Sequence, residues 1–245
     1  MKKVAFISDI HGNLEAFQAV LADIDRLAIQ TIFCLGDCVG YGPEPEQVIT
    51  EIRNRSIPTV MGNHELALIN DRYSNSFNLI ARQSLDITRS LISPATRQYI
   101  ATMPTTLLYR DARMVHGCPP ASITRYLFVF AAQEYLLKKI FSEFAETLCF
   151  FGHTHTLALY TLDQSGNIHS QRLERGILGL DPHCRHLINI GSVGQPRDGN
   201  NNAKYVIWDE EERTIETRYI PYDIQSTFAK IIAAGLPELN ATRLL

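Results

Sequence analysis

Residues 4–12 read VAFISDIHG: four apolar residues, then a serine, an aspartate and, two positions further on, a histidine. A short apolar run of this kind is typical of a strand that is buried on both faces. Apolar residues at helical spacing follow over 14–28, then an apolar strand over 31–35, a helix over 45–54 and a third strand over 58–61. This alternation predicts parallel strand pairing with right-handed crossovers.

The remainder of the chain is predicted to add helices, a hairpin and many short strands. The expected helices cover 76–102, with a break at Ser93-Pro94, 132–146 and 224–234; the hairpin covers 106–109 and 112–115; the strands cover 147–151, 157–162, 168–173, 186–190, 204–208 and 214–219. No linker, internal repeat or low-complexity tract is visible. We therefore expect a single domain, residues 1–245, of α/β class with two sheets layered between helices.

The composition argues against several classes of protein. The 245 residues are 45% apolar, which is enough for a full core, and the formal net charge is −3 with acids and bases interspersed. Because no block of lysine or arginine occurs, we expect no long nucleic acid as a partner. No run of 18 apolar residues occurs, so we expect no membrane span. The apolar stretch after Met1-Lys2-Lys3 is too short for a signal core, and we expect the chain to open on a strand.

Five short patches contain nearly every group needed to hold two metal ions. They are Asp9-Ile10-His11, Gly36-Asp37, Gly62-Asn63-His64-Glu65, Val115-His116-Gly117 and Gly152-His153-Thr154-His155. Each patch follows an apolar run that is predicted to be a strand. Carboxylates, one amide and several imidazoles at successive strand ends indicate a polynuclear metal site, and metal-assisted phosphoester hydrolysis is the leading hypothesis.

The first two patches supply carboxylates. In an extended segment Asp9 and His11 point the same way and can reach one ion, although Asp9 could instead cap the following helix. Asp37 ends the neighbouring strand and should lie near Asp9, where it can bridge two cations with one oxygen on each. Its alternative role is that of an ordinary turn aspartate after Gly36.

The other patches supply an amide and imidazoles. Asn63 can ligate an ion without adding charge, whereas His64 should point away from it and suits donation of a proton to a leaving oxygen. Glu65 either holds the second nitrogen of His64 or opens a helix. His116 and the pair His153 and His155 complete the set. The remaining histidines, His169, His183 and His186, are interpreted as surface or loop residues.

The five cysteines indicate a reducing environment. Cys34, Cys38, Cys118, Cys149 and Cys184 are odd in number and show no Cys-x-x-Cys spacing, so a disulfide framework and a zinc ribbon are both disfavoured and a cytoplasmic location is expected. Cys34 and Cys149 lie in apolar runs and should be buried. Cys38 and Cys118 lie beside the patches, where they suit the wall of the site better than ligation.

Taken in order, the patches resemble the calcineurin-like metallophosphoesterase superfamily, over residues 4 to about 199. The tracts 36–43 (GDCVGYGP) and 189–197 (NIGSVGQPR) resemble its small bacterial phosphodiesterase-type branch. The resemblance implies a four-layer α/β-β/α sandwich of two mixed sheets with a dinuclear centre of Mn, Fe, Zn or Ni. It implies one ion on Asp9, His11, Asp37 and His155, and a second on Asp37, Asn63, His116 and His153. Asp37 and a hydroxide would bridge the ions, and His64 would be the proton donor.

One departure bears on the substrate. Serine/threonine protein phosphatases of this superfamily have an arginine soon after the bridging aspartate, whereas residues 38–42 here read CVGYG. Arg197 is our candidate for holding a substrate oxyanion together with Asn63, although it could be an exposed loop arginine, and Tyr41 either contacts the substrate or lines the cleft. We expect a small phosphoester as substrate. A protein phosphatase, a nucleotide hydrolase and a metal-poor scaffold are the alternatives, and a homodimer is possible.

Overall fold

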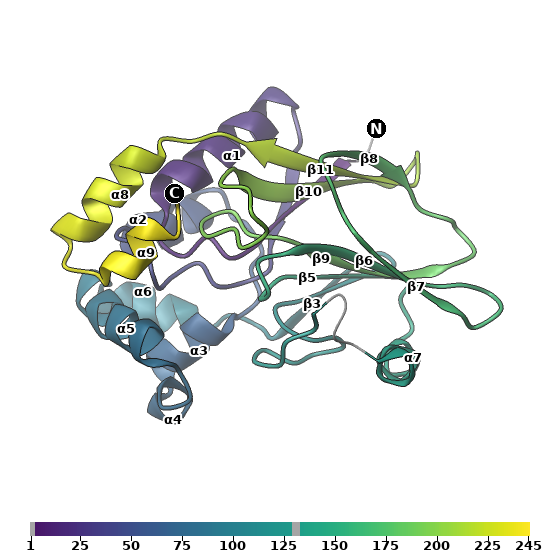
Figure 1. Cartoon of the computed structure of the whole chain (residues 1–245), viewed down its shortest axis with the longest axis horizontal. Helices are drawn as coiled ribbons and strands as arrows, with labels where there is room; N and C mark the ends of the chain where they lie inside the picture. The colour runs from purple at the N-terminus through teal and green to yellow at the C-terminus, as the bar shows by residue number, and fades with distance from the viewer. Residues whose placement is uncertain (1–2, 129–132) are drawn as a thin grey trace.

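Two mixed β-sheets pack face to face, with helices on their outer faces and at one end (Figure 1). The computed structural model describes residues 3–128 and 133–245. The first sheet has the order β2 (Thr31–Cys34), β1 (Lys3–Ile7), β10 (Ala203–Asp209), β11 (Thr214–Ile220) and β8 (Gly176–Gly179). The second has the order β3 (Thr106–Tyr109), β4 (Ala112–Val115), β5 (Leu148–Phe151), β9 (Arg185–Ile190), β6 (Leu157–Leu162) and β7 (Ile168–Arg172). This arrangement confirms the predicted fold class.

Strand β1 explains how the layers are held together. Successive side chains of a strand point to opposite faces. Ala5 and Ile7 therefore pack into the core beneath the helices, whereas Val4 and Phe6 pack into the core between the sheets. The ring of Phe6 stacks on Phe150 of the second sheet with 3.8 Å between centroids. Because both faces are buried, the run from residue 4 to residue 7 is apolar without alternation.

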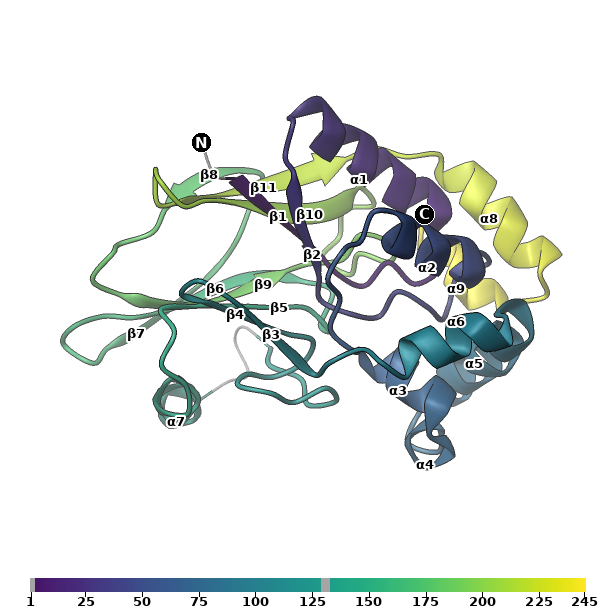
Figure 2. The same ribbon diagram turned by 180° about the vertical axis from the view of Figure 1, so that it is seen from behind.

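The helices cover the sheets and close one end of the molecule. They are α1 (Leu14–Arg26), α2 (Pro45–Asn54), α3 (Asn63–Ile69), α4 (Asp71–Ser74), α5 (Leu79–Leu91), α6 (Pro94–Ile100), α7 (Glu134–Ser142), α8 (Ile224–Ala233) and α9 (Glu238–Thr242). Helices α1 and α2 bury their apolar faces against the first sheet, and α7 covers the second sheet. Figure 2 shows α3 to α6 grouped beyond the strand ends, on the same side as α8 and α9.

Most predicted elements are confirmed within one or two residues. The hairpin β3–β4 occurs as expected, and the Ser93 side chain accepts the N–H of Thr96 at the start of α6. The third strand, over 58–61, was wrong: this segment makes a single parallel bridge, between Thr59 and Cys34, because the N–H of Met61 turns away to the carbonyl of Pro104. Strand β8 and the short helices α4 and α9 were not predicted.

Two predictions fall partly outside the described residues. They concern the start of the chain, at Met1 and Lys2, and the start of the predicted helix 132–146, at Ala132, none of which the structure describes. The single-domain assignment stays a prediction. The longest helices in the described chain, α1 and α5, have 13 residues each, and none of its helices has the length and apolarity needed to cross a bilayer.

Candidate metal centre

The carboxyl ends of the parallel strands in both sheets meet at one place. Strands β1 and β2 are parallel in the first sheet, and β4, β5 and β9 are parallel in the second. The loop after β9 joins the two ends, because Ser192 Oγ and the N–H of Gly194 both donate to the carbonyl of Asp9. All five patches therefore converge between the sheets, as expected for strand ends that point the same way.

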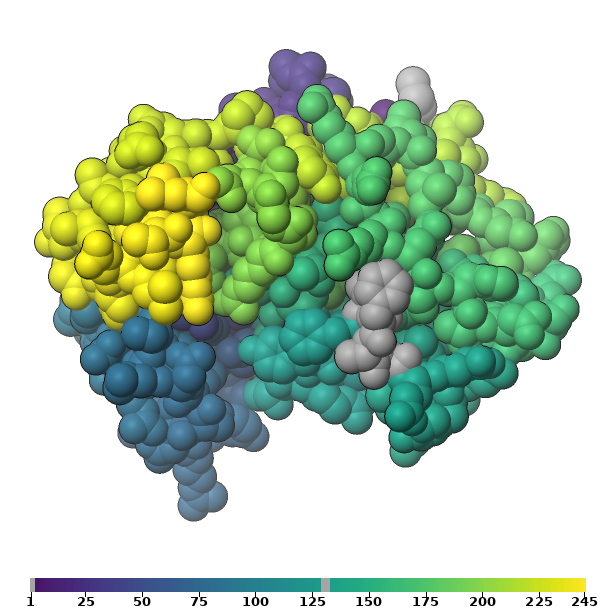
Figure 3. All heavy atoms as spheres, viewed as in Figure 1, coloured from purple at the N-terminus to yellow at the C-terminus, as the bar shows by residue number. Residues whose placement is uncertain are grey.

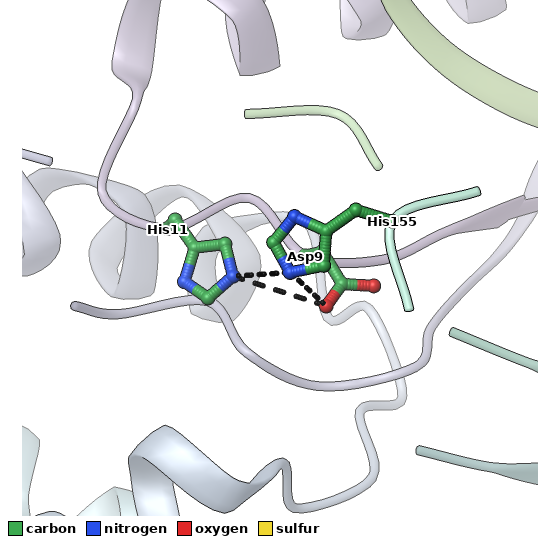
Figure 4. A group of neighbouring side chains, drawn as sticks. All are labelled: Asp9, His11 and His155. Carbon is green, nitrogen blue, oxygen red and sulfur yellow. Dashed lines mark hydrogen bonds and ion pairs between the residues drawn. The ribbon is translucent and has the colours of Figure 1, made fainter. Parts of the chain in front are cut away.

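One group of ligand atoms comes from Asp9, His11 and His155 (Figure 4). Asp9 Oδ1 lies 3.2 Å from His155 Nε2 and 3.8 Å from His11 Nε2, and the two imidazole nitrogens are 3.1 Å apart. All three side chains are buried. Asp9 Oδ1 has no hydrogen-bond partner among the described residues, which leaves a carboxyl oxygen directed at two imidazoles.

A second group comes from Asp37, His116 and His153. His116 Nε2 lies 3.2 Å from Asp37 Oδ2, 3.1 Å from His153 Nδ1 and 3.0 Å from Asn63 Oδ1. Asp37 Oδ2 also lies 3.8 Å from His11 Nε2 of the first group. The same oxygen thus faces both groups, while Asp37 Oδ1 accepts the N–H of His64. The bridge of one Asp37 oxygen to each ion stays a prediction.

The hydrogen bonds of the imidazoles fit bound cations. Each of the four rings donates its outer N–H to a backbone carbonyl: His11 Nδ1 to Val39, His116 Nδ1 to Leu35, His153 Nε2 to Thr124 and His155 Nδ1 to Gln195. In the neutral form of each ring the inner nitrogen carries a lone pair, and the inner nitrogens face each other in two couples at 3.1 Å. Burial would lower the pKa of His116, but the charge of Asp37 raises it to about 10, so without a bound cation this ring carries a proton on both nitrogens. Lone pairs at this separation repel unless a positive charge lies between them. Such outer bonds are the usual way in which proteins orient metal-binding histidines.

The pKa values of the buried groups depend on their burial and on the charges of their neighbours. Burial would raise the pKa of Asp37, but the charges of His116 and His64 hold it well below its usual value. Burial raises the pKa of Asp9 to about 7. Burial also lowers the pKa of His11 and that of His155 well below the usual value, which favours the neutral, ligating form.

Left-handed backbone brings the candidate ligands together. Asp9, His11, Asp37, His153 and His155 have φ between 51° and 70°. The predicted extended geometry of the Asp9–His11 and His153–His155 pairs was therefore wrong. In each pair the loop itself turns, which sends Asp9 and His11 to one group and separates His153 from His155. Non-glycine residues in this region are uncommon and cluster at functional sites.

Glu65 organises the loop that contains Asp37. Its Oε2 accepts the N–H groups of Asp37 and Gly62, and its Oε1 accepts those of Cys38 and Val39, at 2.7 to 3.1 Å. The side chain is fully buried, and burial raises its pKa to about 7. Glu65 lies in the first turn of helix α3, which confirms one of the two interpretations of this residue. Its oxygens are occupied by backbone N–H groups rather than by the His64 ring.

His64 lies beside both groups. It and Asn63 are the first residues of α3, so the extended-chain reason for separating their side chains was wrong. The ring is 4.8 Å from that of His11 and 4.6 Å from that of Tyr41, and its ligand atoms group with those of His11 and Asp37. His64 Nδ1 is buried and lacks a partner in the described chain. Burial lowers the pKa of His64 to about 4.

Arg197 and Tyr41 form the wall on the side of His155. The N–H of Arg197 donates to the His155 carbonyl at 3.2 Å, and its guanidinium donates to Gln195 Oε1 and lies 5.8 Å from the Tyr41 ring centroid. Tyr41 is buried against His11, and Asn240 of α9 donates to its carbonyl. Arg197 is an exposed loop arginine, as one of the two interpretations held, and its guanidinium lies beside Tyr41; its role in holding a substrate oxyanion stays a prediction.

The remaining histidines and the cysteines lie apart from the two groups. His169 and His183 are exposed, as predicted. The prediction for His186 was wrong: it is buried in β9, where it bonds the Thr161 hydroxyl and the carbonyl of Asp181.

All five cysteines are free, and Cys38 Sγ faces Cys34 Sγ at 3.5 Å. Sequence reasoning missed Tyr126, whose ring stacks on His153, because nothing near Tyr126 in the sequence resembles a ligand patch.

This fold and this set of aspartate, asparagine and histidine side chains define a metal-dependent phosphoester hydrolase. The model of the calcineurin-like phosphoesterase superfamily domain matches residues 1–213, and the chain belongs to that superfamily.

The chain is 35% identical to an uncharacterized protein of Methanocaldococcus jannaschii over 98% of its own length and 96% of the relative's. Its structure resembles that of a metallophosphoesterase from Sphaerobacter thermophilus, with a TM-score of 0.84, 33% identity and coverage of 99% and 97% of the two chains. It also has the fold of a hypothetical protein from Pyrococcus horikoshii, with a TM-score of 0.80, 20% identity and coverage of 100% and 98%.

Proposed function

We propose that this protein hydrolyses small phosphoesters with a dinuclear metal centre. The observation that supports this most strongly is the arrangement of four imidazoles in two couples, His11 with His155 and His116 with His153. Within each couple the inner nitrogens face each other, and Asp37 lies near one ring of each couple. One ion would lie on Asp9, His11, Asp37 and His155, and the other on Asp37, Asn63, His116 and His153. Mn, Fe, Zn and Ni all accept this mixture of oxygen and imidazole ligands.

The protein residues have separate tasks in the proposed reaction. When bound, two divalent ions lower the pKa of a water between them and neutralise charge on the phosphoryl group. Asp37, whose Oδ2 faces both groups, would be shared between the two ions. Arg197, beside Tyr41, would pair with a phosphoryl oxygen, and Asn63 would orient the same group. His64 would supply a proton to the leaving oxygen, and its position next to both groups supports this role.

The alternatives fit this site less well. A metal-poor scaffold would have no use for buried imidazoles whose inner nitrogens face each other at 3.1 Å. A protein phosphatase of this superfamily would be expected to have an arginine in residues 38–42, whereas here the guanidinium comes from Arg197, beyond β9.

A hydrolysis screen tests the proposal. Phosphomonoesters and phosphodiesters would be supplied to the protein with each of the four metals, and bound metal would be counted by mass spectrometry. We expect up to two ions per chain and metal-dependent turnover. Asp37→Asn and His116→Ala should lose the ions and the activity while circular dichroism stays native. Full activity in both variants would refute the assignment.

A further inference from the structure

Lys204 is a buried lysine that has no task in the proposed reaction. It lies in β10, among side chains that are mostly apolar, and is 0% exposed. Its ammonium pairs with Asp198 Oδ1 at 2.8 Å and donates to the carbonyls of Asn200 and Asn202. The ring of Tyr219 covers it, with 5.0 Å from the nitrogen to the ring centroid. The three N–H donors of the ammonium therefore have three oxygen partners.

The packing of the strand does not require a charge at this position. The neighbours of Lys204 in β10, Ala203 and Tyr205, are fully buried. Burying a charge costs free energy, and a well-packed apolar side chain of similar volume is often as stable or more so. All three oxygens that the ammonium binds belong to residues 198–202. The charge thus serves this segment, which we call the return limb.

The return limb cannot be ordered by apolar packing. Its sequence is DGNNN, without an apolar side chain, and residues 199–201 are exposed. In Figure 3 the light-green residues of this part of the chain lie on the surface, next to the yellow C-terminal helices. The Asn201 side chain donates to the carbonyl of Leu245. A limb of this composition depends on polar bonds for its position, and Lys204 supplies three of them.

Arg197 lies between two anchored parts of one loop. On its amino-terminal side, Ser192 Oγ and the N–H of Gly194 donate to the carbonyl of Asp9. On its carboxyl-terminal side, the ammonium of Lys204 binds the return limb. Because the backbone is held on both sides, the Arg197 guanidinium has a defined place beside the metal centre.

Lys204 also occupies a carboxylate that could otherwise compete for Arg197. Asp198 follows Arg197 directly in the sequence, and a carboxylate and a guanidinium at short range attract each other. With Asp198 paired to Lys204, the guanidinium of Arg197 bonds the neutral Oε1 of Gln195 at 2.7 Å. Its positive charge is then left for an anionic ligand.

We propose that Lys204 is a positioning residue for Arg197: its buried ammonium fixes the return limb and keeps the guanidinium available to a phosphoryl oxygen. The inference rests on the proposed function, in which Arg197 pairs with that oxygen. Because Lys204 acts through Arg197, the effects of replacing the two residues should not add.

The experiment compares Lys204→Met, Arg197→Ala and the double variant, each loaded with metal and supplied with bis(p-nitrophenyl) phosphate. Loss of a charge-assisted bond to the substrate should raise KM about 10- to 150-fold in Arg197→Ala. We expect Lys204→Met to raise KM by up to the same factor, with kcat and the number of bound ions nearly unchanged. KM of the double variant should be no higher than that of Arg197→Ala. An unchanged KM in Lys204→Met, or multiplied effects in the double variant, would overturn the inference.

Arg185→Met is the matched control. The Arg185 guanidinium donates to the carbonyls of Phe141, Phe144 and Glu146, so it too is a cation that holds one segment through backbone oxygens. It lies at the start of β9, whereas the metal centre lies beyond the end of that strand. Arg185→Met should lower stability against urea, as Lys204→Met does, and leave KM unchanged. An equal rise in KM would show that any loss of stability has this effect, and would overturn the inference.

Phosphate binding separates this inference from the proposed function. Calorimetry with inorganic phosphate on the metal-loaded protein needs no turnover. Weaker binding in Lys204→Met, with no further loss in the double variant, supports the inference even if no ester is hydrolysed, an outcome that would refute the proposed function alone. Wild-type affinity in Lys204→Met would refute the inference, whatever the hydrolysis results. Where Lys204→Met does not fold, Lys204→Gln carries the same test, because its amide keeps two donors for the carbonyls and loses the charge that holds Asp198.

Discussion

Replacing Glu65 by glutamine should destabilise the protein far more than the loss of one charge suggests. The carboxylate accepts four buried backbone N–H groups, two on each oxygen. Glutamine keeps one acceptor oxygen and turns an NH₂ donor toward the other two N–H groups, which lose their partner. Each unsatisfied buried donor costs about 1–3 kcal/mol. The free energy of unfolding should therefore fall by about 2–6 kcal/mol, a large part of the total for a typical domain.

The measurement is urea denaturation in the presence of a chelator, so that ion binding does not contribute. Glu51→Gln is the control, because Glu51 pairs with Arg55 on the surface of α2 and its loss should cost at most about 1 kcal/mol. Two of the four N–H groups flank the Asp37 side chain, so Glu65→Gln should also weaken metal binding. A loss no larger than that of Glu51→Gln would refute the reasoning. It would mean that Glu65 is protonated and that glutamine mimics it.

Three further predictions concern acid stability, proton donation and the packing of His64. Burial would raise the pKa of Asp23, but hydrogen bonds, led by the one from Arg218, lower this pKa to about 2. Its folded pKa is below the unfolded value of 3.8, so its contribution of about 2 kcal/mol is present above pH 4 and is lost as the pH falls toward 2; Asp23→Asn should flatten this limb of stability against pH. His64→Ala should retain both ions by mass spectrometry yet lower kcat by about 10²- to 10⁴-fold, and loss of the ions would make His64 a ligand instead. A Cβ on Gly40 (φ +84°) would overlap His64 Nδ1, whereas a Cβ on Gly166 (φ +80°) would face open space. Gly40→Ala should therefore lower activity and stability much more than Gly166→Ala. Equal effects of the two substitutions would argue against the contact between Gly40 and His64.

The sequence predicted which side chains come together because strand ends are local features. An apolar run that stops at Asp9 identifies a strand end whatever the rest of the chain does, and parallel pairing then brings Asp37 near it. The backbone of these residues was not predictable in the same way, because a left-handed φ at an aspartate depends on contacts made after folding. Hydrogen bonds from the Asp37 loop to Glu65, and the stacking of Tyr126 on His153, join residues more than 25 positions apart. Neither leaves a local pattern.

The carbonyls that hold the four imidazoles have a consequence for how the protein matures. They belong to Leu35, Val39, Thr124 and Gln195, and the bonded imidazoles lie 28 to 81 positions away in sequence. In a chain emerging from the ribosome, the last of these carbonyls, that of Gln195, follows the whole second sheet and precedes β10 and β11 of the first sheet. Asp9, His11 and Asp37, which follow strands of the first sheet, therefore lack the imidazoles of the second sheet until the two sheets dock. We expect metal acquisition to be a late event in biogenesis, in which a preformed pocket selects its ions instead of the ions guiding the fold.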